Sequence, residues 1–181
     1  IEGLYGSLHN DLLTGGNSVN DSIEFFRSDA GNDTVDGGSG FDRVDYNNSP
    51  NGVVVTLGGY SDGSAQDGFG NVDVLRNIEA VRGSEHNDRF IGSNRNTYSV
   101  DNYVEVFYGL AGDDTLDGSA GAIVVADYLF STQAVTVNLL TGTAQDGHGG
   151  TDTLISVAGV RGSKYADSLI GNDLNNGFTG R

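Results

Sequence analysis

Polar and apolar positions recur along this chain on a nine-residue beat. Glu24, Asp33 and Asp42 are nine residues apart, and an apolar residue follows each of them two positions later. Those apolar residues are Phe26, Val35 and Val44. Nine residues make about 2.5 turns of an α-helix, so a helix does not keep one face over this beat. The pattern predicts short strands joined by glycine turns, with the middle side chain of each strand pointing inward.

The same beat returns twice later in the chain. Glu105 and Asp114 repeat the acidic spacing, and Ile123 is predicted to occupy the third acidic position of that series. A third series opens with Asp167 and continues nine residues later with Asn176. The apolar residues of these two series are Phe107, Leu116, Val125, Leu169 and Phe178.

Longer self-similarity divides the chain into units. Three Gly-Ser pairs, 77 and 79 residues apart, are each followed by an aspartate five residues after the glycine. These aspartates are Asp11, Asp88 and Asp167. We predict a first unit over residues 6–82, a second over 83–161, and the start of a third unit or a C-terminal cap over 162–181. Together they are expected to form one continuous elongated body.

Each unit also contains a segment outside the nine-residue beat. Residues 53–57 and 135–139 alternate apolar and other side chains, which is typical of a strand with one buried face. A loop is expected next, followed by a second apolar stretch. The expected loops are 65–73 and 144–152, and the second apolar stretches are 74–81 and 154–160. The pattern predicts an antiparallel strand–loop–strand insertion in each unit.

Composition and charge exclude several function classes. Glycine, aspartate and asparagine make up more than a third of the chain, which disfavours long helices. The 25 acidic and nine basic residues give a net charge of −16, which disfavours binding to nucleic acids and to anionic membranes. No apolar run is long enough to cross a bilayer. Two carboxylates about 4 Å apart repel by roughly 4 kcal/mol at an effective dielectric near 20, so a fold that gathers them needs bases or cations.

One segment carries a recognisable motif. Residues 37–45 read Gly-Gly-Ser-Gly-Phe-Asp-Arg-Val-Asp, which follows the Gly-Gly-x-Gly-x-Asp-x-apolar-x pattern of calcium-binding RTX repeats. The chain resembles this haemolysin-type family over most of residues 6–180. The resemblance implies an all-β fold, a right-handed parallel β-roll of Gly/Asp-rich nonapeptides, here with antiparallel insertions. It also implies several bound Ca²⁺ ions and export by type I secretion.

The resemblance further implies metal ligands in the glycine turns and at the acidic positions, since Ca²⁺ takes carboxylate and backbone carbonyl oxygens. Turns on the same side of the roll, two nonapeptides apart, share an ion in that family, which places one site around Asp42 and another, on the opposite side, around Asp33. The implied ligand residues are Ala30, Gly31, Asp33, Gly37, Ser39, Gly40, Asp42, Gly109, Ala111, Gly112, Asp114, Asp11, Asp88, Asp167, Glu24 and Glu105. Each aspartate has a structural alternative, which is to cap its own turn backbone.

Two further features leave alternatives open. The loops Asp67–Asp73 and Asp146–Asp152 are either additional calcium loops or simple hairpin connections. Arg82 and Arg161 either form structural ion pairs with turn carboxylates or contact an anionic ligand. Ser28-Asp29 in place of a glycine pair, and an apolar residue at a third acidic position, predict fewer sites than in a long uninterrupted array.

No sequence feature indicates catalysis, so we expect no enzyme activity. Nucleophile elbows, zinc-binding helices and phosphate loops are absent from the sequence. His148 lies in a repeated loop where the other copy has Phe69, which disfavours a role as general base.

The function that we expect is a non-catalytic calcium-binding module of a larger secreted or cell-surface bacterial protein. It would fold on Ca²⁺ binding after export and act as a scaffold or adhesion region. The first residue is Ile, and no basic, apolar leader follows, which predicts that the chain is part of a longer polypeptide. The alternative is a polyuronate-binding module attached to a secreted polysaccharide-active enzyme, with an extracellular glycan as partner. The residues that suggest it are Tyr60, Phe69, Tyr98, Tyr103 and the two arginines Arg82 and Arg161.

Overall fold

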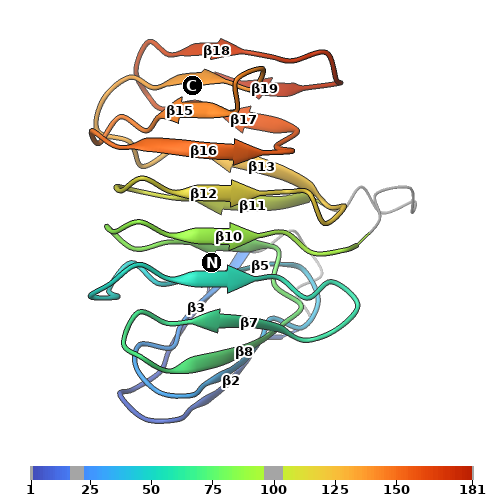
Figure 1. Cartoon of the computed structure of the whole chain (residues 1–181). Helices are drawn as coiled ribbons and strands as arrows, with labels where there is room; N and C mark the ends of the chain where they lie inside the picture. The colour runs from blue at the N-terminus through green and yellow to red at the C-terminus, as the bar shows by residue number, and fades with distance from the viewer. Residues whose placement is uncertain (1, 17–22, 96–103, 181) are drawn as a thin grey trace.

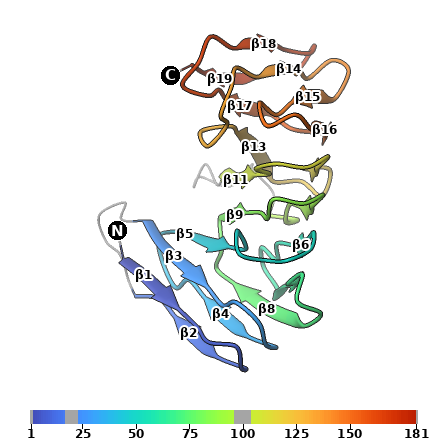
Figure 2. The ribbon, with the colours of Figure 1, turned by 90° about the vertical axis from the view of Figure 1, so that its left-hand side faces the viewer.

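The protein folds as a coil of short strands and turns. The structure is a computed structural model that describes residues 2–16, 23–95 and 104–180. These residues form strands, turns and bends and contain no helix, which confirms the predicted all-β class. No helix long and apolar enough to cross a membrane is found in the part of the chain that is described. The coils stack from the blue N-terminal end to the red C-terminal end (Figures 1 and 2).

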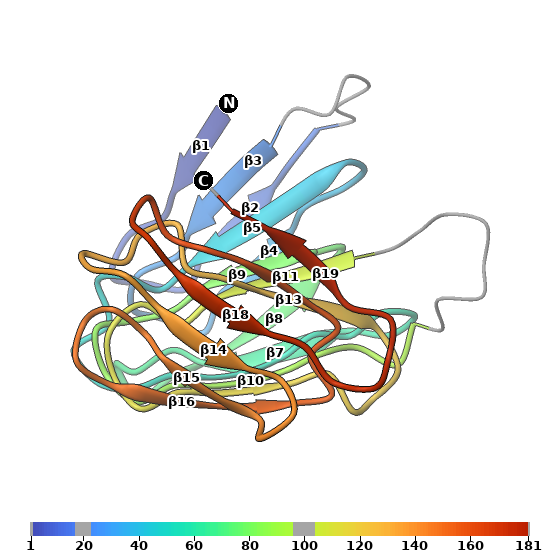
Figure 3. The same cartoon turned by 90° about the horizontal axis from the view of Figure 1, so that it is seen from above.

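One side of the coil is a sheet of eight strands, all paired in parallel. In spatial order its strands are β1 (Glu2–Tyr5), β3 (Ile23–Arg27), β5 (Phe41–Asp45), β9 (Ala80–Arg82), β11 (Val104–Tyr108), β13 (Ile123–Asp127), β17 (Gly159–Arg161) and β19 (Gly177–Thr179). Seen from above, the later coils, from green to red, overlie one another, and β1 and β3 project to one side of them (Figure 3).

The other side is a mixed sheet of eleven strands. In spatial order they are β18 (Ser168–Ile170), β14 (Thr136–Asn138), β15 (Thr143–Gln145), β16 (Thr151–Ile155), β12 (Thr115–Asp117), β10 (Arg89–Ile91), β6 (Val54–Thr56), β7 (Gly63–Gln66), β8 (Val72–Arg76), β4 (Thr34–Asp36) and β2 (Leu12–Thr14). β7 and β15 run antiparallel to both of their neighbours (Figure 1). All other pairs in this sheet are parallel.

Inward-pointing side chains of both sheets form one continuous core. In the three-residue strands β4 and β6 the middle residue is buried and its two neighbours are partly exposed. The nine-residue beat predicts this for β4, and the alternation over residues 53–57 predicts it for β6. Phe26, Val35 and Val44 are completely buried, which confirms the predicted phase of the first series. The same core contains Phe90 and Phe107, whose ring centroids are 5.5 Å apart.

The second series keeps its predicted phase at Phe107 and Leu116, which are buried, but is shifted by one residue at its third position. Glu105 in β11 lies opposite Val124 in β13, and Phe107 lies opposite Ala126. Ile123 therefore does not occupy the third acidic position, and Val125 is not the inward apolar residue. The prediction was wrong because the turn before β13 is one residue longer than the turn before β5, so the nine-residue spacing ends there.

The insertions contain one strand more than predicted. β6, β7 and β8 form an antiparallel three-stranded meander, and the expected loop 65–73 includes the end of β7 and the start of β8. The predicted second apolar stretch is also divided, because Asn77 adopts a positive φ of 51° between β8 and β9. β14, β15 and β16 repeat the meander in the second copy. The division of the chain at residues 82 and 161 stays a prediction, since both sheets continue through these positions.

Candidate metal centre

Four acidic side chains lie in register at the start of neighbouring strands of the eight-stranded sheet. We call Glu24, Asp42, Glu79 and Glu105 the Glu–Asp row. Glu24 pairs with Asp42 across β3 and β5, and Glu79 immediately precedes β9, between β5 and β11. The strand register thus brings these four residues together from positions up to 81 residues apart in sequence.

Asp42 occupies the most constrained position in this row. Its side chain is completely buried, and neither carboxylate oxygen accepts a hydrogen bond from a described residue. Its backbone amide donates to Glu79 Oε2 at 2.9 Å. Burial, together with the charges of Glu79 and Glu24, raises the pKa of Asp42 to about 7. A buried carboxylate without a donor is costly, so this position favours either a proton or a cation.

Glycine turns bring backbone oxygens to the same place. The Gly16 amide donates to Glu24 Oε2 at 3.0 Å, and the Ser39 amide donates to the Gly16 carbonyl at 3.3 Å. A Cβ on Gly15 would collide with both the Gly37 carbonyl oxygen and Glu24 Oε2, so only glycine permits this approach. The predicted ligand residues Gly37, Ser39, Gly40, Asp42 and Glu24 therefore belong to one pair of stacked turns.

The row ends at Glu105, its one member in the second copy. Glu105 lies opposite Val124, which is completely buried. The Ser93 amide donates to both carboxylate oxygens of Glu105, at 3.2 and 2.9 Å. Glu105 thus has protein donors, and no second acid stands opposite it on β13.

A second row of acids lies at the start of strands in the eleven-stranded sheet. We call Asp11, Asp33, Asp73, Asp88, Asp114, Asp152 and Asp167 the Asp row. Within it the amide of one aspartate donates to Oδ1 of the next: Asp11 to Asp33 at 2.7 Å and Asp33 to Asp73 at 3.1 Å. The second copy repeats this, from Asp88 to Asp114 at 2.8 Å and from Asp114 to Asp152 at 3.2 Å.

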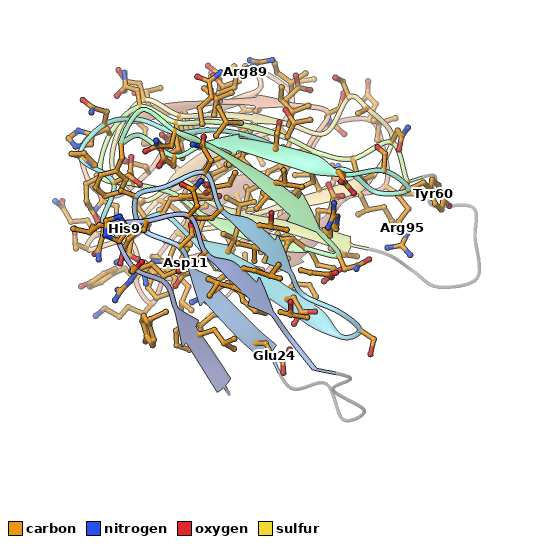
Figure 4. The ribbon with its side chains drawn as sticks, turned by 90° about the horizontal axis from the view of Figure 1, so that it is seen from below. His9, Asp11, Glu24, Tyr60, Arg89 and Arg95 are labelled. Atoms are coloured by element: carbon orange, nitrogen blue, oxygen red, sulfur yellow. The ribbon has the colours of Figure 1, made fainter. Side chains whose placement is uncertain are left out.

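The predicted ligands Ala30, Gly31 and Asp33 lie in the turn before β4, and Gly109, Ala111, Gly112 and Asp114 lie in the equivalent turn before β12. Both turns therefore end at members of the Asp row, Asp33 and Asp114, on the side of the coil opposite Asp42. Figure 4 shows Asp11 of the Asp row and Glu24 of the Glu–Asp row at separate places on the molecule.

The three aspartates of the Gly-Ser segments have protein donors of their own. Asp88 Oδ2 accepts the Ser84 amide at 2.7 Å, and Asp88 Oδ1 accepts the Ser84 hydroxyl at 2.8 Å and the Val53 amide at 2.8 Å. Asp11 and Asp167 accept equivalent bonds from Ser7 and Ser163. These bonds give the three residues the turn-capping role, and their predicted metal role stays a prediction.

Burial raises the pKa values of three aspartates of the Asp row in the second copy. Burial, reinforced by the charges of Asp152 and Asp88, raises the pKa of Asp114 to about 9. Burial also raises the pKa of Asp152 to about 7 and that of Asp88 to about 6. Asp114 Oδ2, like Asp33 Oδ2 in the first copy, is buried and accepts no hydrogen bond within the described part of the chain.

Two recurring arginines contact other carboxylates. Arg82 lies 4.0 Å from Asp45, and Arg161 lies 3.4 Å from Asp127. The structure therefore has the ion pairs of the structural alternative, and these pairs do not neutralise either acidic row.

Sequence reasoning missed Asp73, Asp152 and Glu79 as members of the rows. Asp73 and Asp152 accept, on Oδ2, the hydroxyl groups of Tyr46 and Tyr128, each at 3.0 Å. All three acids precede an inward apolar residue by two positions, as the nonapeptide acids do. That signal was present in the sequence, but it lies in the insertions, outside the nine-residue beat.

The donor set fits a hard divalent cation better than a transition metal, because it consists of carboxylate and carbonyl oxygens. Among the described residues, no group of three or more acidic or histidine side chains is arranged to hold a metal ion. Calcium sites also take backbone carbonyls as ligands, and the carbonyl of Gly37 lies beside the carboxylate of Glu24.

Comparison with known families agrees with this chemistry. Residues 25–44 and 101–122 match the family model of the RTX calcium-binding nonapeptide repeat (4 copies). The chain carries RTX calcium-binding repeats. The first RTX match contains the Asp33 turn and the turn that leads to Asp42, and the second contains the Asp114 turn. RTX repeats bind calcium and occur in secreted bacterial proteins. No curated protein matches the chain.

Proposed function

We propose that this chain is a calcium-dependent folding module without catalytic activity, part of a larger secreted or cell-surface bacterial protein in which it acts as a scaffold or adhesion region. In a calcium-poor cytoplasm the acidic rows repel, and the chain stays loose enough for type I export. Outside the cell Ca²⁺ binds the stacked turns and stabilises the coil. The RTX match supports the calcium chemistry of this proposal.

The observation that carries the proposal is the burial of the Asp42 carboxylate between two other acids. A completely buried carboxylate whose two oxygens accept no hydrogen bond from the described residues lies between Glu24 and Glu79, on a turn with the RTX sequence. Burying an ionised carboxylate without a compensating partner costs several kcal/mol, whereas a cation shared with neighbouring carbonyls compensates the charge. Binding to the folded state alone adds about 2.7 kcal/mol per site at a hundredfold excess over Kd.

Calorimetric titration of Ca²⁺ into the chelator-treated chain, with far-ultraviolet circular dichroism before and after, tests the proposal. We expect a largely unfolded spectrum in EGTA and a cooperative gain of β signal as several ions bind. Mg²⁺ at the same ionic strength is the control, because it requires a near-octahedral site and dehydrates reluctantly. A cooperative β spectrum that persists in excess EGTA would falsify the coupled-folding proposal.

One observation favours the polyuronate-binding alternative. Tyr60 is 70% exposed, and the guanidinium of Arg95 lies 5.7 Å from the centroid of its ring (Figure 4). Such a pair could stack on a sugar ring and contact a carboxylate. Arg82 and Arg161 support this alternative less, because both are ion-paired. Tyr98 and Tyr103 lie outside the described residues.

Titration of an oligomeric alginate into the calcium-loaded chain separates the two functions. Saturable binding that is lost in Tyr60→Ala would establish the glycan module. The scaffold function predicts no saturable binding in either protein.

A further inference from the structure

The two hairpin loops of the insertions hold an aspartate in the same unusual environment. Asp67 lies in the loop between β7 and β8, and its Oδ1 accepts three successive amides, those of Phe69, Gly70 and Asn71, at 2.9, 3.0 and 2.9 Å. In the second copy Asp146 Oδ1 accepts three amides at 2.8, 2.9 and 2.9 Å. The loop amides thus use only one oxygen of each carboxylate.

The second oxygen of each carboxylate has no hydrogen-bond partner in the described part of the chain. Asp67 and Asp146 are completely buried, and Oδ2 of each accepts no hydrogen bond from the described residues. Three amides on Oδ1 satisfy the loop backbone, so Oδ2 is not needed to close the hairpin. An ionised oxygen in this position requires a compensating positive charge.

A matching oxygen comes from the nonapeptide turn that packs against each loop. Asp33 Oδ2 and Asp114 Oδ2 are also buried and unpartnered within the described chain. The loops are held on these turns by the Val72 amide, which donates to Asn32 at 3.0 Å, and by the Thr151 amide, which donates to Asp113 at 2.7 Å.

The charges of the paired aspartates act on each other. After burial and the charge of Asp11, the charge of Asp67 adds to the rise in the pKa of Asp33. In the second copy, Asp146 likewise adds to the rise in the pKa of Asp114.

A backbone carbonyl completes the oxygen set in the second copy. A Cβ on Gly150 would collide with the Gly112 carbonyl oxygen and lie 2.9 Å from Asp146 Oδ2, so these two oxygens are close together. Glycine at position 150 leaves this space free of side-chain atoms. A carboxylate oxygen of the hairpin loop and a carbonyl oxygen of the turn that ends at Asp114 therefore meet here, and oxygens of these two kinds suit Ca²⁺.

We propose that Asp67 with Asp33, and Asp146 with Asp114, form two additional Ca²⁺ sites that join each inserted hairpin to the neighbouring RTX turn. The hairpin aspartates lie outside both segments that match the repeat family. This inference rests on the proposed function, because Asp33 and Asp114 belong to the repeat turns. It adds that calcium joins the inserted hairpins to the coil and also stabilises the stacked turns of the coil.

Asparagine is the substitution that isolates the unpartnered oxygen. Asp67→Asn and Asp146→Asn keep a carbonyl Oδ1 for the three loop amides and replace Oδ2 by an NH₂ group, which repels a cation. Asp62→Asn is the matched control, because Asp62 lies in the same meander, is exposed, and pairs with Arg76 at 2.7 Å. All variants are made in the full chain, folded in Ca²⁺ and checked by circular dichroism.

Calorimetry on these proteins gives distinguishable outcomes. We expect each asparagine variant to bind fewer Ca²⁺ ions at saturation than wild type, by one ion per substituted loop, and Asp62→Asn to bind the wild-type number. Unchanged stoichiometry and affinity in both loop variants, with calcium still bound elsewhere, would overturn the hairpin sites and leave the proposed function intact. A wild-type chain that binds no Ca²⁺ would instead overturn the proposed function.

Anomalous diffraction from calcium-loaded wild-type crystals is the second measurement, and it does not depend on a variant that folds. Anomalous density between Asp33 and Asp67, and between Asp114 and Asp146, is the expected result. Density confined to the glycine turns would contradict the inference.

Discussion

Glu105 lies opposite Val124 where the first copy places Glu24 opposite Asp42. The same strand pairing is therefore acidic on both sides in one copy and acidic on one side in the other. The difference is chemical as well as geometric, since Glu105 receives the Ser93 amide while neither oxygen of Asp42 has a donor among the described residues. This makes the two copies a natural comparison between a carboxylate pair suited to a cation and a position that is only packed.

Asp42→Asn is expected to remove a calcium ion from the chain. The substitution deletes the buried charge but keeps the size of the side chain, so the fold in saturating Ca²⁺ should survive. The free Ca²⁺ needed for half-maximal folding should rise about tenfold, equivalent to about 1.4 kcal/mol. Calorimetric stoichiometry and a calcium titration followed by circular dichroism measure both effects.

Val124→Ala is the control for Asp42→Asn at the equivalent position of the second copy. Loss of buried methyl groups should lower stability by about 2 kcal/mol, since Val124 is completely buried. Because no ligand is removed, the number of bound ions should not change. The same loss of stoichiometry in both variants would mean that Asp42 acts through packing alone.

In the absence of calcium, lowering the pH is expected to restore part of the stability that calcium provides, because protons neutralise the buried carboxylates. Burial raises the pKa of Asp114 to about 9, and burial also raises the pKa values of Asp42 and Asp152 to about 7. An unfolded aspartate titrates near 3.9, so between about pH 4 and pH 9 the folded chain binds more protons than the unfolded chain. Stability in EGTA must then fall as the pH rises through this window.

The measurement is the β signal in circular dichroism, recorded in EGTA from pH 8 down to pH 5. We expect the signal to grow as the pH falls, and Asp114→Asn to flatten the dependence. In the presence of Ca²⁺ the trend should reverse, since protons compete with the ion for the same carboxylates. A chelated chain that loses β signal on acidification would contradict this account.

The sequence predicts the roll because its signal is local. An acid followed two residues later by an apolar side chain places Val35 and Val44 in the core from their spacing alone. The longer turn before β13 is not visible in this way, because Ile123, Val124 and Val125 are all apolar and any of them suits an inward position. Only the pairing of Glu105 with Val124 decides the register.

The antiparallel strands and the hairpin sites are less accessible to prediction. β7 buries only Gly63 and Ala65, which are too small to give an apolar period. The contacts of Asp33 with the insertion also join residues 40 positions apart, as in its hydrogen bond to Asp73. The matching Ala-Gln-Asp-Gly segments of the two copies mark Asp67 and Asp146 in the sequence, but not the turn against which each one packs.

Tyr128→Phe is expected to cost more stability than Tyr46→Phe, although the two hydroxyls make equivalent bonds. Tyr46 shares Asp73 Oδ2 with the Ser28 hydroxyl, which donates to it at 3.2 Å. The position equivalent to Ser28 in the second copy is Gly109, so the Tyr128 hydroxyl is the one donor described for Asp152 Oδ2. Removing it leaves a buried, charged acceptor unpaired, which costs about 1.5 to 3 kcal/mol, whereas Asp73 keeps one donor.

Urea unfolding of both variants and wild type at one fixed, saturating Ca²⁺ concentration measures this difference. Equal m-values are required for the comparison, because they show that the denatured states are alike. Tyr128→Phe should have the lowest midpoint and Tyr46→Phe an intermediate one. The reverse order would mean that the serine hydroxyl does not compensate Asp73, and that the two copies do not differ in how they satisfy their buried carboxylates.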